Sequence, residues 1–553
     1  VGHQSYTHKI LTGRKLGFVT LRQYGGMSGF PKTQEDPADA FNTGHSSTSI
    51  SAGLGMAQAR ELTGDNYYVV SVIGDGALTG GMAYEAMNNA SRMKTNFIIV
   101  LNDNQMSISE NVGGMNQYLN SFRTSDAYLD LKDGVTNSLN RIPVVGERMV
   151  KRIRNAKSGI KQLFVPGMFF ENMGITYLGP VDGTNIKEIR KVLAEAKRVR
   201  GPVLVHVRTI KGEGYLPAER HPARFHGTGP FDIDTGVPLY HQEKAHYTDV
   251  FSTVMRKMGE REPKVVAITA AMADGTGLKR FKNLFPERFF DVGIAEEHAV
   301  TFAAGMAKAG LKPVFAVYSS FLQRAYDQVL HDVCAQNLAV VFAVDRAGLV
   351  GKDGATHQGI FDLSYLSSIP NLTVMAPKNK WELSDMLKYA IAAEEPVAIR
   401  YPRGEACDLW KDQRAPIQKG CAEVLAEGTE VALFAIGSMV ETAWQVRKKL
   451  AEKGIPTAVV NARFAMPLDK NCLRKLAESH PLLVTMEENV ASGGFGEHVA
   501  AFLEEEALHT KVLRIAIPDC FVEHGSVGEL KKALGLDADS VTEKILAELP
   551  EEL

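Results

Sequence analysis

Apolar segments of strand length alternate with amphipathic segments of helix length along most of this chain. Such alternation predicts parallel strands joined by helices that cover the sheet. In the first third, the expected strands and then the expected helices are 69–73, 96–102 and 202–208, followed by 44–63, 79–92 and 185–198. Ser46 or Ser47 is expected to cap the helix at 44–63, and Gly64 to end it.

The same alternation returns twice, after the turn-rich stretch 225–244 and after a second break around 402–420. The second block has expected strands at 264–269, 289–293, 313–318, 339–344 and 372–375, and helices at 296–309, 321–333 and 380–393. In the third block VALFAIG, TAVVNAR and PLLVTMEE read as strands between amphipathic helices. The predicted fold class is α/β with three domains, each a mostly parallel sheet flanked by helices, at 1–242, 243–415 and 416–553.

Composition narrows the classes of function. The chain has 553 residues, of which 45% are apolar and 23% charged, with a net charge of −2, so nothing points to nucleic acid or a membrane surface as a partner. No apolar run approaches the roughly twenty residues of a membrane-spanning helix. The five cysteines are scattered without a CxxC pair, which favours a reducing compartment over a zinc site.

The segment 70–106, VSVIGDGALTGGMAYEAMNNASRMKTNFIIVLNDNQM, carries the strongest chemical signal. Asp75 and Asn104 follow two successive expected strands, and parallel pairing would bring them side by side at one sheet edge. A carboxylate, an amide oxygen and a backbone carbonyl suit Mg²⁺, with phosphate oxygens completing the shell. Gly74 and Gly76 would let a diphosphate approach the backbone. The alternative is that Gly-Asp-Gly is only a turn.

Two further regions are less informative. Residues 107–170 are weakly patterned, and the basic residues Arg148, Lys151, Arg152 and Arg154 are expected on a solvated helix face. The first residues, VGHQSYTHKILTGRK, are not a signal peptide and include no initiator Met. We therefore expect the sequence to begin inside a domain.

The Gly-Asp-Gly motif with its later Asn resembles the metal–diphosphate motif of thiamine diphosphate enzymes. Longer blocks, among them DVGIAEEHAVTFAAGMAKAG, YSSFLQRAYDQVLHDV, DRAGLVGKDGATHQGIFDLSYL and YPRG, resemble the 1-deoxy-D-xylulose 5-phosphate synthase family over essentially the whole chain. The resemblance implies a transketolase-like fold, thiamine diphosphate and Mg²⁺. It also implies condensation of pyruvate with D-glyceraldehyde 3-phosphate to 1-deoxy-D-xylulose 5-phosphate and CO₂, the first step of the non-mevalonate isoprenoid route, which also feeds thiamine and pyridoxal synthesis.

The resemblance also assigns cofactor roles. Glu296 would face the pyrimidine N1′ and Phe321 would stack on the pyrimidine, although Glu296 alone reads as an acidic residue in a first helical turn. Asp75, Asn104 and the Met106 carbonyl would hold the metal. The remaining implied cofactor contacts are His3, Gly44, His45, Ser46, Gly76, Ala77, Asn104 and Tyr215. His3 and His45 are also candidate catalytic residues on the resemblance, whereas a lone His is more often structural.

The phosphorylated acceptor needs cationic, forked donors, for which Arg346 and Arg403 are the candidates, with Tyr318 supporting them. Arg403 reads equally well as a surface ion pair. Asp353 and His357 lie on a loop after an expected strand, where substrate contacts are common. An imidazole titrates in a useful range, so His357 is a candidate proton shuttle.

Two other functions remain open at this stage. Transketolase would share the fold, the metal motif and the glutamate, but would transfer a ketol unit between sugar phosphates. A non-catalytic paralogue would be expected to have lost Glu296, Asp75 or Asn104, and all three are present. The resemblance further implies a homodimer in the bacterial cytoplasm. Members of the family begin earlier, with a Gly-Gly-His segment, so a plastid location with a transit peptide stays open.

Overall fold

A computed structural model describes residues 2–107, 111–121, 167–239 and 243–550. The chain forms two compact units, one comprising Ser46–His241 and the other Gly2–His45 together with Gln242–Leu553. The N-terminal segment therefore groups with the later part of the chain, whereas the sequence placed it in a first domain at 1–242. The three domain bounds stay a prediction. The basic stretch around Arg148 lies outside the described residues.

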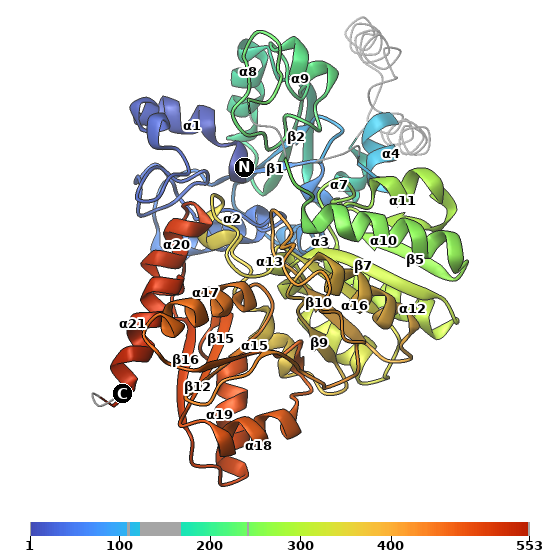
Figure 1. Cartoon of the computed structure of the whole chain (residues 1–553). Helices are drawn as coiled ribbons and strands as arrows, with labels where there is room; N and C mark the ends of the chain where they lie inside the picture. Colours follow the sequence, from blue (N-terminus) through green and yellow to red (C-terminus); the bar gives the residue numbers. More distant parts are fainter. Residues whose placement is uncertain (1, 108–110, 122–166, 240–242, 551–553) are drawn as a thin grey trace, which may run out of the picture. The chain divides into compact units, whose positions relative to one another are not determined.

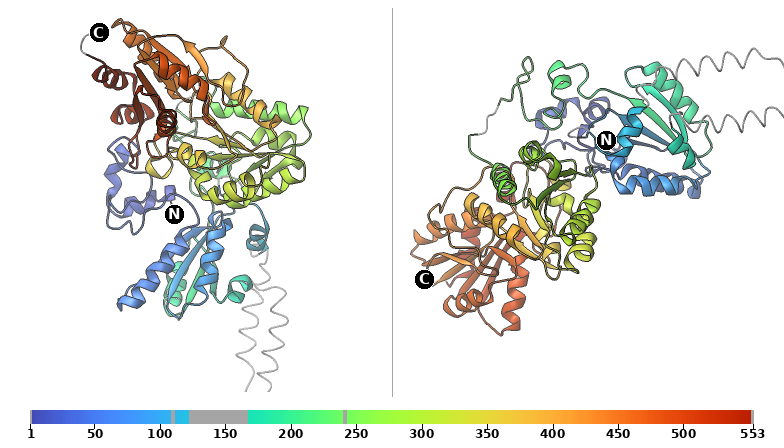
Figure 2. Two further views of the ribbon diagram at one scale, coloured as in Figure 1. Left: turned by 90° about the horizontal axis from the view of Figure 1, so that it is seen from below. Right: turned by 90° about the vertical axis from the view of Figure 1, so that its right-hand side faces the viewer.

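The first unit is built on one parallel sheet with the order β1-β2-β4-β3. Its strands are β1 (Val70–Gly74), β2 (Phe97–Asp103), β3 (Thr176–Asp182) and β4 (Pro202–Arg208). Its helices are α2 (Ser49–Thr63), α3 (Gly81–Ala90), α4 (Gly114–Ser121), α7 (Met168–Asn172), α8 (Ile186–Ala196) and α9 (Leu216–Arg220). Figure 2 shows helices on both sides of this sheet.

Alternate residues of the central strands enter two separate cores. Phe97 and Ile99 pack with α2 and α3 on one face, whereas Ile98 and Val203 pack with α8 on the other. Because both faces are covered, these strands read as continuous apolar runs, and three of the four were predicted from that pattern. The edge strand β3 was missed, since it interrupts its apolar residues with Gly179 and Pro180.

The start of α2 differs from the prediction. The helix begins at Ser49, and no side chain caps its first turn. Ser47 instead adopts a left-handed conformation (φ 73°) and donates a hydrogen bond to the carbonyl of Ala77 over 2.6 Å. The predicted end is confirmed, because Gly64 closes the helix at φ 72°.

The second unit contains a seven-stranded sheet with the order β14-β9-β10-β8-β7-β5-β6. Its strands are β5 (Val265–Thr269), β6 (Phe289–Asp291), β7 (Lys312–Tyr318), β8 (Val341–Asp345), β9 (Thr373–Met375), β10 (Val397–Arg400) and the antiparallel β14 (Phe464–Met466). Figure 1 shows this sheet among helices α10 (Tyr247–Arg261), α11 (Lys279–Leu284), α12 (Glu296–Lys308), α13 (Ser319–Leu322), α14 (Tyr326–Gln328), α15 (Asp362–Ser367) and α16 (Lys380–Ala392). The apolar faces of α10 and α16 pack on one side of it.

Two details of this sheet depart from the sequence prediction. The expected helix at 321–333 is a chain of short pieces, in which α13 and α14 are followed by a π-helical segment at Val329–Cys334. The interior strand β10 was not predicted, because only four residues separate a Pro from the polar YPRG turn.

The last part of the chain forms a five-stranded sheet with the order β11-β13-β12-β15-β16. Its strands are β11 (Glu423–Ala426), β12 (Val431–Ala435), β13 (Thr457–Asn461), β15 (Leu482–Val490) and β16 (Lys511–Ile517), and only β11 pairs antiparallel. Its helices are α17 (Met439–Ala451), α18 (Lys470–Ser479), α19 (Phe495–Glu505), α20 (Val527–Ala533) and α21 (Ala538–Glu548). No helix within the described residues is long and apolar enough to cross a membrane.

The N-terminal segment Gly2–His45 contains a 3₁₀ turn (Gly2–Gln4), α1 (Tyr6–Leu11) and a second 3₁₀ stretch (Arg14–Thr20). An ion cluster holds it together: both Nη atoms of Arg14 donate to Asp39 at 2.8 Å, and His8 donates to the same carboxylate. Burial acts against the charge of Asp39, but these hydrogen bonds keep its pKa well below the usual value. The cluster therefore fixes the segment that carries His3 and His45.

A buried charged network joins the last two sheets. Glu382 on α16 accepts hydrogen bonds from Arg463 Nε at 2.8 Å and from Lys378 Nζ at 3.3 Å, and Asn461 donates to the same carboxylate. All four side chains are almost completely excluded from solvent. Removing one partner of such a network leaves the other charges buried without compensation.

We therefore predict that Glu382→Ala lowers the free energy of unfolding by about 3–5 kcal/mol. Glu478→Ala is the matched control, because Glu478 is exposed on α18 and its loss should change the free energy by less than about 0.5 kcal/mol. Urea unfolding followed by circular dichroism measures both values. Equal midpoints for the two variants would contradict the stabilising role of the network.

Candidate active site

Asp75 lies just after β1, beside the end of β2, as the sequence predicts. The two strands pair in parallel, and the Asp75 amide donates to the Asn102 carbonyl at 3.2 Å. The side chain is 3% exposed and accepts a hydrogen bond from Asn111 Nδ2 at 2.9 Å. Burial, followed by the charge of Asp103, raises the pKa of Asp75 to about 7. A carboxylate in this setting gains most from a bound cation.

Asn104 and Met106 lie in the turn that follows β2. Gln105 between them has φ 65°, and the Met106 amide donates to Asn104 Oδ1 at 3.0 Å. Among the described residues there is no cluster of three His, Cys, Asp or Glu side chains able to hold a metal ion. The donors near Asp75 are instead amide and carbonyl oxygens, which suit a hard cation such as Mg²⁺. Asn111 was not predicted, since no motif marks it.

Backbone packing is tight around the turn after Asp75. A Cβ on Gly76 would lie 2.8 Å from the Cβ of Ser107, so only glycine fits without a shift. Ala77 begins the next short 3₁₀ turn, and Ser47 holds its carbonyl. Gly74 differs, because nothing lies within 4 Å of a Cβ there. Of the two predicted glycines, Gly76 is the one whose surroundings require the missing side chain.

The loop after β4 contributes a cation and an aromatic ring. Lys211 Nζ donates to the Ser107 carbonyl and to His226 Nδ1. Burial lowers the pKa of Lys211 to about 8, although Asp75 acts in the opposite direction. Tyr215 packs against Phe225 at 5.6 Å between ring centroids and donates its hydroxyl to the Ile233 carbonyl. Lys211 was missed because a lysine before glycine carries no chemical signal by itself.

Glu296, in the second unit, begins α12 and is 2% exposed. Burial raises its pKa to about 7, despite Arg324, whose Nη1 lies 3.7 Å from Glu296 Oε2. That oxygen is buried and has no hydrogen-bond partner in the described structure. An orphaned carboxylate oxygen costs stability, so its retention indicates a partner outside the chain. Ser46, by contrast, begins the other unit.

Four rings gather beside the loop that follows β8. Phe321 meets His45 edge to face at 5.1 Å and meets His357 at 5.3 Å, and it stacks on Tyr318 at 5.5 Å. His45 Nε2 donates to the Thr356 carbonyl at 2.7 Å, and burial lowers its pKa. A Cβ on Gly44 would come within 2.6 Å of Thr356. The end of the N-terminal segment therefore lies against this loop.

His357 is the most perturbed of these rings. Burial lowers its pKa to about 3, opposed only in part by Asp353, so the imidazole is neutral at pH 7. Phe30 stacks on it at 5.0 Å, and His3 lies 6.3 Å from Phe30. The expectation that His357 titrates near neutral pH is therefore wrong for this environment. Phe30 was missed because a single aromatic residue in an irregular segment has no pattern to mark it.

The predicted acceptor residues lie close together at the carboxyl ends of β7 and β8. The guanidinium carbon of Arg346 lies 3.8 Å from the centre of the Tyr318 ring. Asp353 accepts hydrogen bonds from Arg403 Nη1, at 3.3 Å, and from Arg22. Burial opposes ionisation of Asp353, but His357 and the arginines outweigh it and lower its pKa. Arg22, from the N-terminal segment, was not predicted.

The structure thus brings the predicted residues together in two groups, one in each unit. The first group is Ser46, Asp75, Gly76, Ala77, Asn104, Met106 and Tyr215. The second group is His3, Gly44, His45, Glu296, Tyr318, Phe321, Arg346, Asp353, His357 and Arg403.

The buried Glu296 generates a pH-dependent prediction for the protein without added ligands. An acid whose folded pKa exceeds its unfolded value destabilises the fold as pH rises between the two, here from about 4.5 to about 7. Glu296→Gln should therefore unfold at a higher temperature than the unchanged protein at pH 8, with a gain of at most about 3 kcal/mol. Below pH 5 the difference should vanish. Thermal unfolding across this range tests it, with the half-buried Glu297→Gln as control; a pH-independent difference would refute it.

Three family models match consecutive parts of the chain. The model described as 1-deoxy-D-xylulose-5-phosphate synthase matches residues 1–209. The models for the transketolase pyrimidine-binding domain and the transketolase C-terminal domain match residues 243–407 and 420–541. Together with the three mostly parallel sheets, these matches give the chain a three-domain, transketolase-like α/β fold.

Curated relatives match over nearly the full length. A 1-deoxy-D-xylulose-5-phosphate synthase of Lachnoclostridium phytofermentans is 58% identical over 99% of this chain and 87% of its own. That of Clostridium tetani is 52% identical over 99% of this chain and 88% of its own. A solved structure titled as a split-gene transketolase, an inactive β4 tetramer, is 30% identical with a TM-score of 0.50, covering 55% of this chain and 98% of its own. This chain therefore belongs to the 1-deoxy-D-xylulose-5-phosphate synthase family.

Proposed function

We propose that this chain catalyses the thiamine diphosphate-dependent condensation of pyruvate with D-glyceraldehyde 3-phosphate, giving 1-deoxy-D-xylulose 5-phosphate and CO₂. The observation that carries this proposal is the identity of 58% to a synthase of that name over 99% of the chain. The reaction is the entry to the non-mevalonate isoprenoid route, and its product also feeds thiamine and pyridoxal synthesis.

The residues of each group fit a part of the cofactor. In the first unit, the buried Asp75 with Asn104 and the Met106 carbonyl would hold Mg²⁺, while the tight backbone at Gly76 would accommodate the diphosphate. In the second unit, Glu296 offers a buried oxygen that lacks a partner. When bound, thiamine diphosphate supplies the carbon nucleophile and the electron sink that no side chain provides.

Glu296 would hold a proton at Oε2, against a ring nitrogen of the cofactor. Its raised pKa of about 7 lets the carboxyl bind and release that proton near neutral pH. The Phe321 ring, held at its edges by His45 and His357, would support the pyrimidine by stacking.

The acceptor would lie over the loop after β8. Arg346 and Arg403 provide guanidinium groups for its phosphate, and Tyr318 holds Arg346 against its ring face. Asp353 orders Arg403 through their ion pair. His357 is neutral, so it would act as a hydrogen-bonding group or proton acceptor and not as a standing acid.

Assembly and location rest on the family resemblance. We propose a homodimer, which size-exclusion chromatography with light scattering would test directly. A location in the bacterial cytoplasm stays a prediction.

The activity prediction concerns Glu296. With pyruvate, D-glyceraldehyde 3-phosphate, Mg²⁺ and thiamine diphosphate, the protein should form deoxyxylulose phosphate. Glu296→Ala should lower kcat by about a thousandfold or more, because the proton at the ring nitrogen then has no acceptor. Glu297→Gln, on the same helical turn, should retain activity.

Product analysis by mass spectrometry distinguishes the alternatives. Ketol transfer from xylulose 5-phosphate, with no turnover of pyruvate, would reject the synthase and favour transketolase. Binding of cofactor without any turnover would favour a non-catalytic paralogue.

The metal prediction concerns Asp75. Thiamine diphosphate with Mg²⁺ should raise the melting temperature of the protein, because a ligand stabilises only the state that binds it. Asp75→Asn should abolish most of that rise, since the amide keeps the shape of the carboxylate but loses its charge. Asp65→Asn, at the exposed end of α2, is the control and should behave like the unchanged protein. An undiminished rise in Asp75→Asn would exclude Asp75 as a metal ligand.

A further inference from the structure

The loop that carries the acceptor residues has little regular structure of its own. We call residues 346–361, between β8 and α15, the substrate loop; it bears Arg346, Asp353 and His357. Its base is closed by two hydrogen bonds between Gly348 and Gly359, of 2.6 and 2.8 Å. The residues between form only a short 3₁₀ turn at Gly354–Thr356. The shape of the loop must therefore come from contacts outside its own backbone.

Gln358 supplies the main internal contact of the loop. Its side-chain oxygen accepts a hydrogen bond from the Val350 amide at 2.7 Å and a longer one from Gly351 at 3.4 Å. Its side-chain nitrogen donates to the backbone carbonyl of Glu523 at 3.1 Å. The residue is 2% exposed, so these groups have no water to replace them. Gln358 thus ties one strand of the loop to the other and both to the C-terminal part of the chain.

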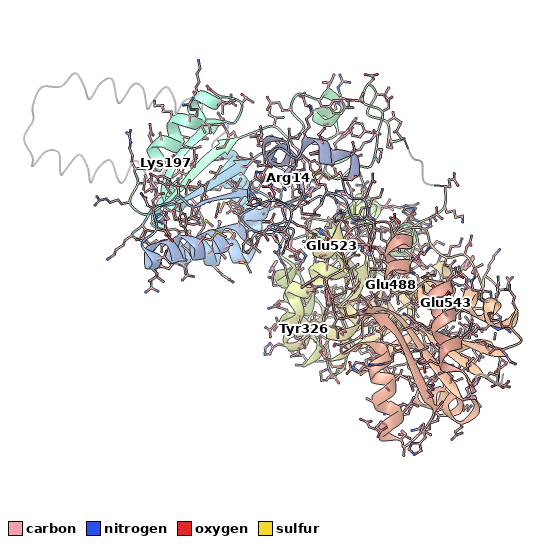
Figure 3. The ribbon with its side chains drawn as sticks, turned by 90° about the vertical axis from the view of Figure 1, so that its left-hand side faces the viewer. Arg14, Lys197, Tyr326, Glu488, Glu523 and Glu543 are labelled. Carbon is pink, nitrogen blue, oxygen red and sulfur yellow. The ribbon has the colours of Figure 1, made fainter. Side chains whose placement is uncertain are left out.

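The partner of Gln358 is a turn at 523–525, which we call the C-terminal clasp. Glu523, labelled in Figure 3, forms an ion pair with Lys32 of the N-terminal segment. His524 is 5% exposed and donates from Nε2 to the Gly26 carbonyl at 2.9 Å. Its Cβ would lie only 3.1 Å from a Cβ on Gly354 of the substrate loop. The clasp therefore packs directly on the substrate loop and is itself held by the N-terminal segment.

A second contact lies at the base of the loop. Glu488, also labelled in Figure 3, accepts a hydrogen bond from the Leu349 amide at 2.9 Å. A Cβ on Gly348 would lie 2.8 Å from the Glu488 carboxyl carbon. The C-terminal sheet thus supports the loop from one side, while Arg22 and Phe30 contact Asp353 and His357 from the other.

We propose that Gln358 is a positioning residue, through which the C-terminal clasp holds the substrate loop in the shape that presents Asp353 and His357 to the phosphorylated acceptor. This inference rests on the proposed function of the same site. It gives the C-terminal domain a part in binding the acceptor, although the candidate acceptor residues come from the domain before it.

The amide of Gln358 is required for a simple chemical reason. One end must accept from Val350 while the other donates to the Glu523 carbonyl, and only an amide does both. Glutamate has the same shape and keeps the first bond, but it turns a second oxygen toward the Glu523 carbonyl. Gln358→Glu should therefore release the loop from the clasp with little change of volume. Gln336→Glu is the matched control, because Gln336 is exposed and bonds only to the carbonyl of Asp332.

Steady-state kinetics of the cofactor-loaded protein is the first measurement. Gln358→Glu should raise KM for D-glyceraldehyde 3-phosphate about tenfold or more, while the rise in melting temperature with thiamine diphosphate and Mg²⁺ stays that of the unchanged protein. A purely structural defect would lower the active fraction, and hence kcat, without changing KM. Hydrogen exchange at the substrate loop should also become faster, independently of activity.

A second variant keeps the proposal testable if Gln358→Glu does not fold. His524→Ala removes the contact with Gly354 and the bond to Gly26, and should also raise KM for the acceptor. An unchanged KM and unchanged exchange in the folded variant would overturn the inference, while an unchanged protein that forms no deoxyxylulose phosphate would instead overturn the proposed function.

Discussion

Parallel strands end at the same edge of a sheet, and the loops that leave this edge carry most of the candidate site. Asp75 and Asn104 follow β1 and β2, and Lys211 and Tyr215 follow β4. In the second unit, Tyr318 ends β7, and Arg346 follows β8. Because parallel pairing also requires helical crossovers, the same constraint places Glu296 at the first turn of α12. Strand direction thus determines where chemistry can occur.

Burial then determines what these side chains can do. Asp75 and Glu296 are each excluded from water, and each has its pKa raised to about 7. Neither carboxylate is compensated as well as a structural one such as Glu382, which is surrounded by Arg463, Lys378 and Asn461. The two sets differ in purpose: a compensated charge holds domains together, whereas an uncompensated one is available to a cation or to a ring nitrogen.

The loop after β8 shows how a flexible part of a site is made rigid. Its glycines permit the sharp course of the chain, since Gly348, Gly351 and Gly354 all have positive φ. Glycine alone would leave many shapes accessible, so the course is fixed by contacts from two distant parts of the chain. These are the N-terminal segment, through Arg22 and Phe30, and the C-terminal clasp, through the backbone beside His524.

The sequence by itself determined the strands with long apolar runs, the helices between them and the polar residues at their ends. Periodicity reports burial on a strand or helix face, so β1, β2, β4 and β7 were predictable. It failed for β3, β10 and the divided helix at 321–333, where short or interrupted apolar runs carry too little signal. Motifs identified Asp75, Asn104 and Glu296. Asn111, Lys211, Arg22 and Gln358 were decided only by the tertiary structure, because their roles come from partners far away in the chain. The neutral state of His357 has the same origin, since burial by distant segments sets its pKa.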